Sequence, residues 1–105
     1  MPHVLSASGD VVAILFGFPL ASPPRADLGN KILWVDRAGP ISPVDISAQL
    51  MVGKEPVGEP VARRLDDGFA PSVVDLPDPG CWRLALTSGD RTDSIDLEYI
   101  QTPAG

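Results

Sequence analysis

The sequence has few cysteines, histidines and basic residues, and each shortage argues against a class of protein. The single cysteine, Cys81, cannot form an internal disulfide, so the fold must depend on a hydrophobic core. Eight basic residues against fourteen acidic ones give a formal net charge of −6. A surface of this charge repels phosphate backbones and anionic lipid, which argues against nucleic-acid binding and against adhesion to a bare membrane.

Long hydrophobic runs are also missing. The most apolar stretch is VVAILFGFPLA at residues 11–21, about half of the roughly 20 residues that span a bilayer, so we predict no transmembrane segment. A signal-peptide core can be this short, but nothing basic precedes the run, and we interpret it as a buried strand. If the protein is exported, its signal peptide lies outside this sequence. A cytoplasmic location stays open.

Residues suited to catalysis are sparse. The only histidine, His3, lies near the start of the chain and gives Cys81 no nearby base. The sequence has no Gly-x-Ser-x-Gly elbow and no glycine-rich phosphate loop. We therefore predict a non-enzymatic protein without a cofactor, in which Cys81 is a small, partly buried residue at the start of a strand. A small enzyme with acidic active-site residues is an alternative, because fourteen acids offer many pairs.

Two acidic loops supply candidate metal ligands. The segments LDDG and SGDRTD contain Asp66, Asp67, Asp90 and Asp93, and hard cations prefer carboxylate oxygens. Neither loop has the ligand spacing of an EF-hand, and aspartate is common in turns because its side chain binds nearby main chain. The pair Cys81 and His3 is a second possible donor set, for zinc or copper. A metal-binding domain is therefore an alternative hypothesis.

Prolines and glycines, twelve and ten of them, are spread along the chain and separate short segments of alternating pattern. The clearest is VDISAQLMV at residues 44–52, where every second side chain is apolar, as in a half-buried strand. Residues 81–100 resemble a hairpin, with Trp82, Leu84 and Leu86 before a polar turn and Ile95, Leu97 and Tyr99 after it. The two apolar triplets are expected to share one face of the pair.

Four further segments complete the pattern: residues 11–21, 31–35, 59–65 and 71–77. The segment KILWV at 31–35 is apolar at successive positions, which is typical of a strand covered on both faces. About seven strands at this spacing predict an all-β fold, an antiparallel immunoglobulin-like β-sandwich, formed by one domain over residues 1–105. The predicted core consists of Trp34, Ile46, Leu50, Trp82, Leu84, Leu86, Ile95, Leu97 and Tyr99. We place the six aromatic residues, Phe16, Phe18, Trp34, Phe69, Trp82 and Tyr99, in the core rather than on an exposed stacking platform.

Three segments carry a resemblance to a bacterial family. GNKILWV (29–35), GFAPSVVDLPDPGCWRLAL (68–86) and DSIDLEY (93–99) contain a Pro-Ser-x-x-x-x-Pro-x-x-Gly-Cys-Trp run that leads into the penultimate strand. The chain resembles small β domains of exported or lipoprotein type that have no assigned activity. The resemblance implies an immunoglobulin-like sandwich outside the cytoplasm, and it assigns no catalytic or binding residue.

These observations favour one function over the alternatives. The β pattern, the missing catalytic set and the resemblance together predict a non-enzymatic, extracytoplasmic binding or protein-interaction module. Its partner is expected to be another protein or a component of the cell envelope. The ligand and the oligomeric state do not follow from the sequence.

Overall fold

The computed structural model describes residues 2–24, 29–37, 43–66 and 71–101, and these residues form strands and turns without a helix. The strands are β1 (His3–Leu5), β2 (Val11–Leu15), β3 (Leu20–Ser22), β4 (Lys31–Asp36), β5 (Val44–Val52), β6 (Glu55–Leu65), β7 (Ser72–Val73), β8 (Gly80–Ser88) and β9 (Arg91–Gln101). Nothing in these ranges is a helix long and apolar enough to cross a membrane.

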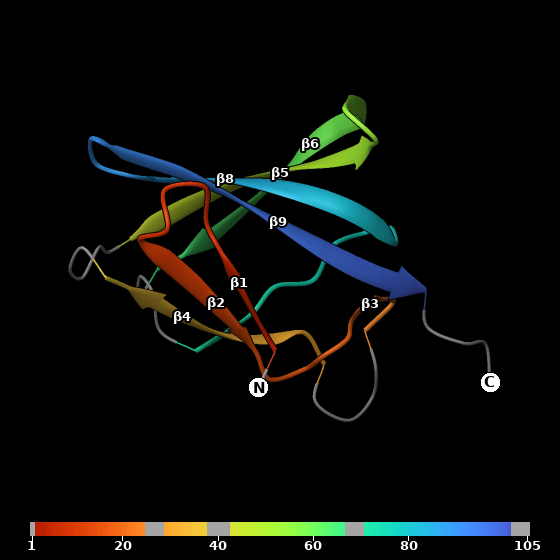
Figure 1. Cartoon of the computed structure of the whole chain (residues 1–105). Helices are drawn as coiled ribbons and strands as arrows, with labels where there is room; N and C mark the ends of the chain where they lie inside the picture. The colour runs from red at the N-terminus through yellow and green to blue at the C-terminus, as the bar shows by residue number, and fades with distance from the viewer. Residues whose placement is uncertain (1, 25–28, 38–42, 67–70, 102–105) are drawn as a thin grey trace.

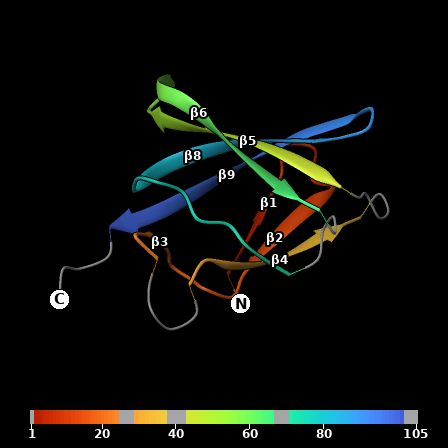
Figure 2. The ribbon, with the colours of Figure 1, turned by 180° about the vertical axis from the view of Figure 1, so that it is seen from behind.

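The strands form two sheets that pack face to face. The four-stranded sheet has the order β1-β2-β4-β7, and the five-stranded sheet has the order β3-β9-β8-β5-β6. All pairings are antiparallel except that of β3 with β9. The two layers are separate in Figure 1, and Figure 2 shows from behind that β5 and β6 extend past the sandwich at one end. The fold is therefore an all-β, two-layer structure.

The described part of the chain has nine strands rather than about seven. The run 11–21, predicted as one strand, supplies β2 to the four-stranded sheet and β3 to the five-stranded sheet. Gly17 lies at the crossing, where an added Cβ would collide with the carbonyl group of Gly29. The other additional strand is β1, which has only three residues and so gives no readable alternation.

Two predicted strands have different limits. The segment expected at 59–65 begins at Glu55, because the turn at Gly53 (φ 62°) returns the chain directly along β5. The segment expected at 71–77 pairs only over Ser72–Val73. Beyond it, Val74 and Leu76 bury their side chains without strand pairing, so their alternation reflects burial alone.

The core lies between the two sheets. Eight of the nine predicted core residues are buried, namely Trp34, Ile46, Trp82, Leu84, Leu86, Ile95, Leu97 and Tyr99, and Leu50 is half-buried against them. In the β8–β9 hairpin, Trp82 stands opposite Leu97 and Leu84 stands opposite Ile95, as the alternation predicts. The Trp82 indole donates to the carbonyl of Asp78 at 2.9 Å, so its one polar atom is satisfied.

Tyr99 and Asn30 fasten the segment after β7 to both sheets. The Tyr99 hydroxyl donates to the carbonyl of Val74 at 2.8 Å, and burial raises the pKa of Tyr99. The buried amide of Asn30 accepts from the Ala21 N–H at 2.8 Å and donates to the Ala21 carbonyl and to a carboxylate oxygen of Asp75, both at 2.9 Å. Polar side chains thus join segments that strand pairing does not.

Candidate interaction surface

The predicted metal ligands do not come together. Asp66 is exposed and pairs with Arg64 at 2.9 Å, and Asp90 is exposed in the turn between β8 and β9. Asp67 lies outside the described residues. Among the residues that the structure describes, no group of three or more histidine, cysteine, aspartate or glutamate side chains is arranged to hold a metal ion.

Asp93 is held by several hydrogen bonds from the first turn of the chain and from its own strand. Its carboxylate accepts from the Ser6 hydroxyl at 2.7 Å, from the Ser8 hydroxyl at 2.6 Å and from the main-chain N–H groups of Ser8 and Ser94 at 3.2 and 2.9 Å. Burial raises the pKa of Asp93, but the hydrogen bonds from Ser8, Ser6 and Ser94 together outweigh it and lower the pKa. These donors fix the first turn of the chain against the last strand.

Cys81 and His3 lie on opposite sides of the sandwich. Cys81 follows the first residue of β8 and alternates with the buried Trp82, so its side chain is exposed on the outer face of the five-stranded sheet. The expectation that Cys81 is partly buried is therefore wrong, because Cys81 alternates with the buried Trp82 and so lies on the outer face of its strand. His3 faces outward from the four-stranded sheet, opposite Ile14. One copy of the chain cannot bring these two donors to a shared metal ion.

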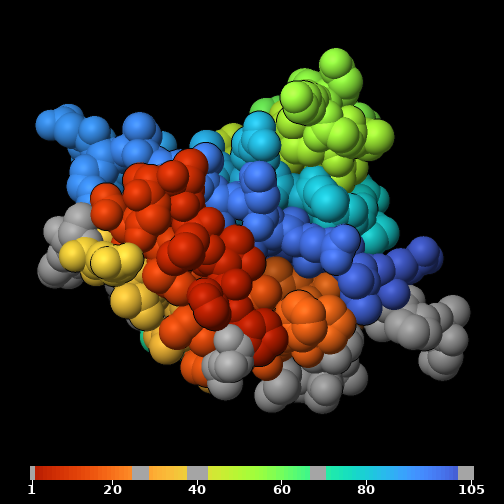
Figure 3. Space-filling view, viewed as in Figure 1, coloured from red at the N-terminus to blue at the C-terminus, as the bar shows by residue number. Residues whose placement is uncertain are grey.

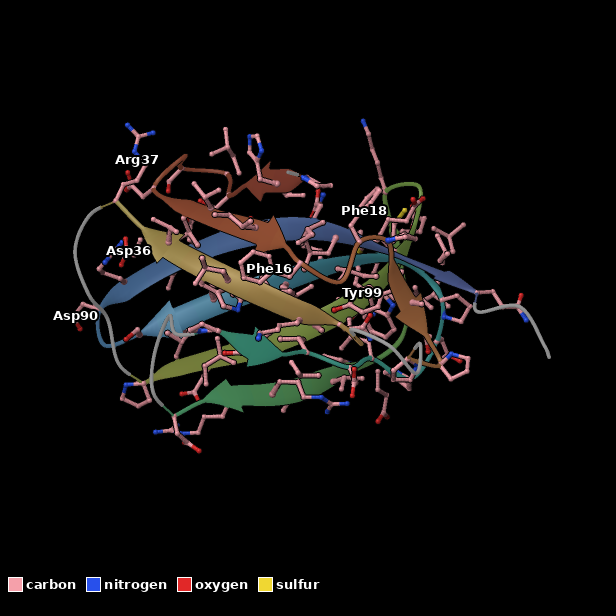
Figure 4. All side chains as sticks on the ribbon, turned by 90° about the horizontal axis from the view of Figure 1, so that it is seen from below. Phe16, Phe18, Asp36, Arg37, Asp90 and Tyr99 are labelled. Atoms are coloured by element: carbon pink, nitrogen blue, oxygen red, sulfur yellow. The ribbon has the colours of Figure 1, made fainter. Side chains whose placement is uncertain are left out.

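Most of the described aromatic residues are internal. Trp34, Trp82 and Tyr99 are buried, and Phe16 is half-buried. Phe18 is 56% exposed in the connection between β2 and β3, so its assignment to the core is wrong. Figure 4 shows Phe18 at the end of the sandwich where this connection crosses between the sheets. Phe69 lies outside the described residues.

The outer face of the four-stranded sheet is apolar. Leu5 stands opposite Val12, Val12 stands opposite Val35, and Ile14 stands opposite Leu33, which places these five side chains side by side. We call this set, Leu5, Val12, Ile14, Leu33 and Val35, the apolar face. Leu5 is 54% exposed and Val35 is 40% exposed, and the other three are half-buried. Figure 3 shows β1 and β2 open to solvent on the near side of the molecule.

This face explains the uninterrupted apolar pattern of residues 31–35. The sequence predicts cover on both sides of that strand, and the structure supplies cover on one side only, where Ile32 and Trp34 enter the core. Within the described residues, no layer of the chain packs on the side of Leu33 and Val35. Contiguous exposed apolar residues on a folded domain are typical of protein–protein interaction sites.

The outer face of the five-stranded sheet is polar instead. Arg64 pairs with Asp45 at 2.7 Å, and Arg83 pairs with Asp96 at 3.0 Å. All four side chains are more than half exposed, so these pairs contribute little to stability. Ser47, Thr87 and Ser94 continue the same polar surface.

A groove separates the four-stranded sheet from the five-stranded sheet along one side. Its volume is about 270 Å³, and its walls include Val4, Leu5 and Ala7 on one side and Arg83, Ile95 and Asp96 on the other. The two sides touch at one end, where the Ala7 N–H donates to the Ser94 carbonyl at 2.8 Å. Leu5 belongs both to the groove and to the apolar face, so the two surfaces are continuous.

Comparison of the chain with protein family models, with curated protein sequences and with solved structures finds no match in any of the three.

Proposed function

We propose that this domain is a non-enzymatic protein-interaction module whose main contact surface is the apolar face. The supporting observation is the set of five outward-facing aliphatic side chains on adjacent strands, which the chain leaves uncovered among its described residues. Burying such surface stabilises a complex by roughly 25 cal/mol for each Å² of apolar area removed from water. The apolar face is a row of aliphatic side chains on adjacent strands rather than a concave pocket with converging polar groups, which favours a protein over a small polar substrate as the occupant.

The charges at the ends of the apolar face favour a different protein over a second copy. Lys31 begins β4 and Arg37 directly follows it, and the alternation of the strand places both at outward-facing positions. Asp10, which directly precedes β2, is the acidic residue beside them. Figure 4 shows Arg37 pointing away from the sandwich, whereas the preceding Asp36 pairs with Arg91 at 2.9 Å. Two copies would bring surplus positive charge together at this surface. The proposed partner therefore presents an apolar surface with acidic residues at its margins.

Strand order supports an immunoglobulin-like topology as part of the proposal. The neighbours β9-β8-β5-β6 have the order of strands G, F, C and C′ in variable-type immunoglobulin domains. We place the domain in the bacterial set that the Pro-Ser…Gly-Cys-Trp run resembles, and therefore outside the cytoplasm. The partner would then be a protein of the cell envelope.

A matched pair of variants tests the function. Leu33→Asn places a polar amide at the centre of the apolar face, and Ala85→Asn places the same amide on an exposed position of the opposite outer face. The parent, the Ala85→Asn variant and the Leu33→Asn variant are each immobilised on a resin and incubated with envelope extract of the source organism. We expect a protein that is retained by the first two and lost from the third, and that binds the purified parent in isothermal titration calorimetry.

Two outcomes would contradict this function. Equal retention by all three proteins would show that the apolar face is not the contact surface. Sedimentation equilibrium in which the parent is dimeric and Leu33→Asn is monomeric would identify a second copy as the occupant and contradict the proposed different partner.

A further inference from the structure

Strand β9 has an open side toward the groove. On its other side β9 pairs with β8 from Arg91 to Tyr99. On the open side, β3 pairs only with Tyr99–Gln101. Among the described residues, the earlier part of β9 pairs with no strand on that side, and Ala7 makes the one backbone contact there that interrupts it.

The main chain of β9 points its hydrogen-bonding groups into this opening. Ser94 uses its carbonyl to accept from Ala7, so the main chain of Ser94 faces the groove rather than β8. In an antiparallel pair, every second residue directs both its N–H and its C=O the same way. Asp96 therefore presents both groups to the groove, one pleat farther along the strand.

The main chain of β1 forms the opposite wall of the groove from β9. The Ser6 N–H donates to Val11 at 2.8 Å, and the Pro2 carbonyl accepts from Leu15 at 2.9 Å, so these two residues face β2. The alternation directs the main chain of Leu5, like that of Ala7, toward β9. Leu5 and Asp96 both line the groove, and β1 and β9 are not paired with each other.

The other long edge of the five-stranded sheet is blocked. Strand β6 has eleven residues, and Pro56 and Pro60 each lack the N–H that an added strand would need. A register shift opposite Gln49 bends the same strand, and the Gln49 amide donates to the carbonyls of Val57 and Gly58 at 3.0 and 3.2 Å. Prolines and bulges are the usual protection against strand addition. The part of β9 that is open between the Ala7 contact at Ser94 and the β3 pairing at Tyr99 contains no proline.

We propose that the groove between β1 and β9 binds an extended segment of the partner, which adds to β9 as a strand. This inference rests on the proposed function as a protein-interaction module. Backbone pairing with Asp96 supplies the affinity, and alternate side chains of the segment supply the specificity. One set of these side chains packs on Val4 and Ile95, so it is apolar. The other set faces solvent beside Glu98 and beside Asp96, which also pairs with Arg83, so it is basic, and the segment alternates apolar and basic residues.

The probe is an acetylated octapeptide that alternates valine and lysine, titrated into the isotopically labelled full chain and followed by nuclear magnetic resonance. We expect shifts at the amides of Asp96 and Leu5 and slower hydrogen exchange at Asp96. The control peptide has the same side chains but carries N-methyl groups on alternate main-chain nitrogens, and it should bind at least about tenfold weaker because it cannot pair as a strand. A third peptide, alternating valine and glutamate, should also bind at least about tenfold weaker.

A second matched pair of variants locates the site. Leu5→Lys and Val73→Lys each place an ammonium group on an edge strand of the four-stranded sheet, at side chains that are 54% and 60% exposed. Leu5→Lys should weaken binding of the lysine-containing peptide about tenfold or more, because like charges repel, and Val73→Lys should leave it unchanged. Circular dichroism verifies that both variants are folded.

Equal affinity for the N-methylated peptide, shifts centred on β6, or no binding at all would overturn strand addition. If the peptides fail while Leu33→Asn still loses the envelope partner, strand addition is wrong and the proposed function stands. If the peptides bind and the Leu33→Asn and Ala85→Asn proteins behave alike, the groove is the contact surface and the apolar face is not.

Discussion

The outer faces of the two sheets differ in polarity, although both sheets pack on the same hydrophobic core. Leu33 and Val35 lie on the outer face of the four-stranded sheet, whereas ion pairs such as Arg83–Asp96 lie on the outer face of the five-stranded sheet. Inward, both sheets contribute the same kind of residue, with Trp34 from one and Trp82 from the other. Stability therefore depends on the shared interior, and any difference in binding must come from the outer faces.

The largest expected effect tests the shared interior. Trp82→Ala should lower the free energy of unfolding by about 3–5 kcal/mol, because it removes a ring that is only 2% exposed and leaves a cavity. Chemical denaturation measures the loss. A Trp82→Ala protein as stable as the parent would show that the inner face of the five-stranded sheet is not part of the core.

The next effect tests how the two sheets are joined at their margins. Asn30→Ala removes the partner of the buried Ala21 main chain, and a buried polar group left unpaired costs about 1–3 kcal/mol. We expect a loss of that size in chemical denaturation. Asn30→Asp is the informative companion, since it keeps the acceptor for the Ala21 N–H but loses the donor to the Ala21 carbonyl and to Asp75. If both variants match the parent, Asn30 does not link the strands.

The third effect concerns the corner where the first turn meets β9. The folded-state pKa of Asp93 lies below its unfolded value, so the ionised carboxylate stabilises the fold at a pH above the unfolded pKa, and this contribution is lost as the pH falls through the folded pKa. Asp93→Asn should therefore be less stable than the parent by about 1–2 kcal/mol at neutral pH, and the difference should shrink in acid. Thermal melts of both proteins between pH 7 and about pH 3 measure it. A difference that does not depend on pH would contradict the role of the charge.

The smallest effects separate the outer faces from each other. Cys81→Ser and Val35→Thr both alter exposed positions and should change the free energy of unfolding by no more than about 0.5 kcal/mol. Val35→Thr should in addition reduce the binding of a hydrophobic fluorescent dye, and Cys81→Ser should not. Equal dye binding by the two variants would remove the distinction between the faces.

The alternation of the sequence predicts the inner faces well because burial of every second residue is local to a strand. Trp82, Leu84 and Leu86 are placed on the inner face in this way, and so are Ile95 and Leu97, which stand opposite Leu84 and Trp82. Alternation does not say which sheet a strand joins, so the division of the run 11–21 between two sheets is invisible in it. Nor does an apolar run such as residues 31–35 say what covers its second side. What covers that second side depends on residues outside the strand itself.

The candidate sites depend still more on contacts between distant segments. Asp93 stands out in the sequence as a possible metal ligand, but its carboxylate is occupied by Ser6 and Ser8, which a local pattern cannot reveal. The groove likewise lies between β1 and β9, segments that are distant in the sequence and that the Ala7–Ser94 hydrogen bond joins at one end. The protection of the β6 edge can, by contrast, be predicted from the sequence, since Pro56 and Pro60 lie in an otherwise strand-like segment.

The contact of the first turn with β9 has a consequence for the newly made chain. Ser6 and Asp93 are separated by 87 positions, so the first hairpin cannot dock until the ribosome has passed the start of β9. At the usual rates of translation this interval is on the order of 10 s. During it, strands β1 and β2 have no interior to cover and their apolar residues are exposed on both sides. Transiently exposed apolar surface of this kind makes a nascent chain prone to aggregation until the docking contact forms.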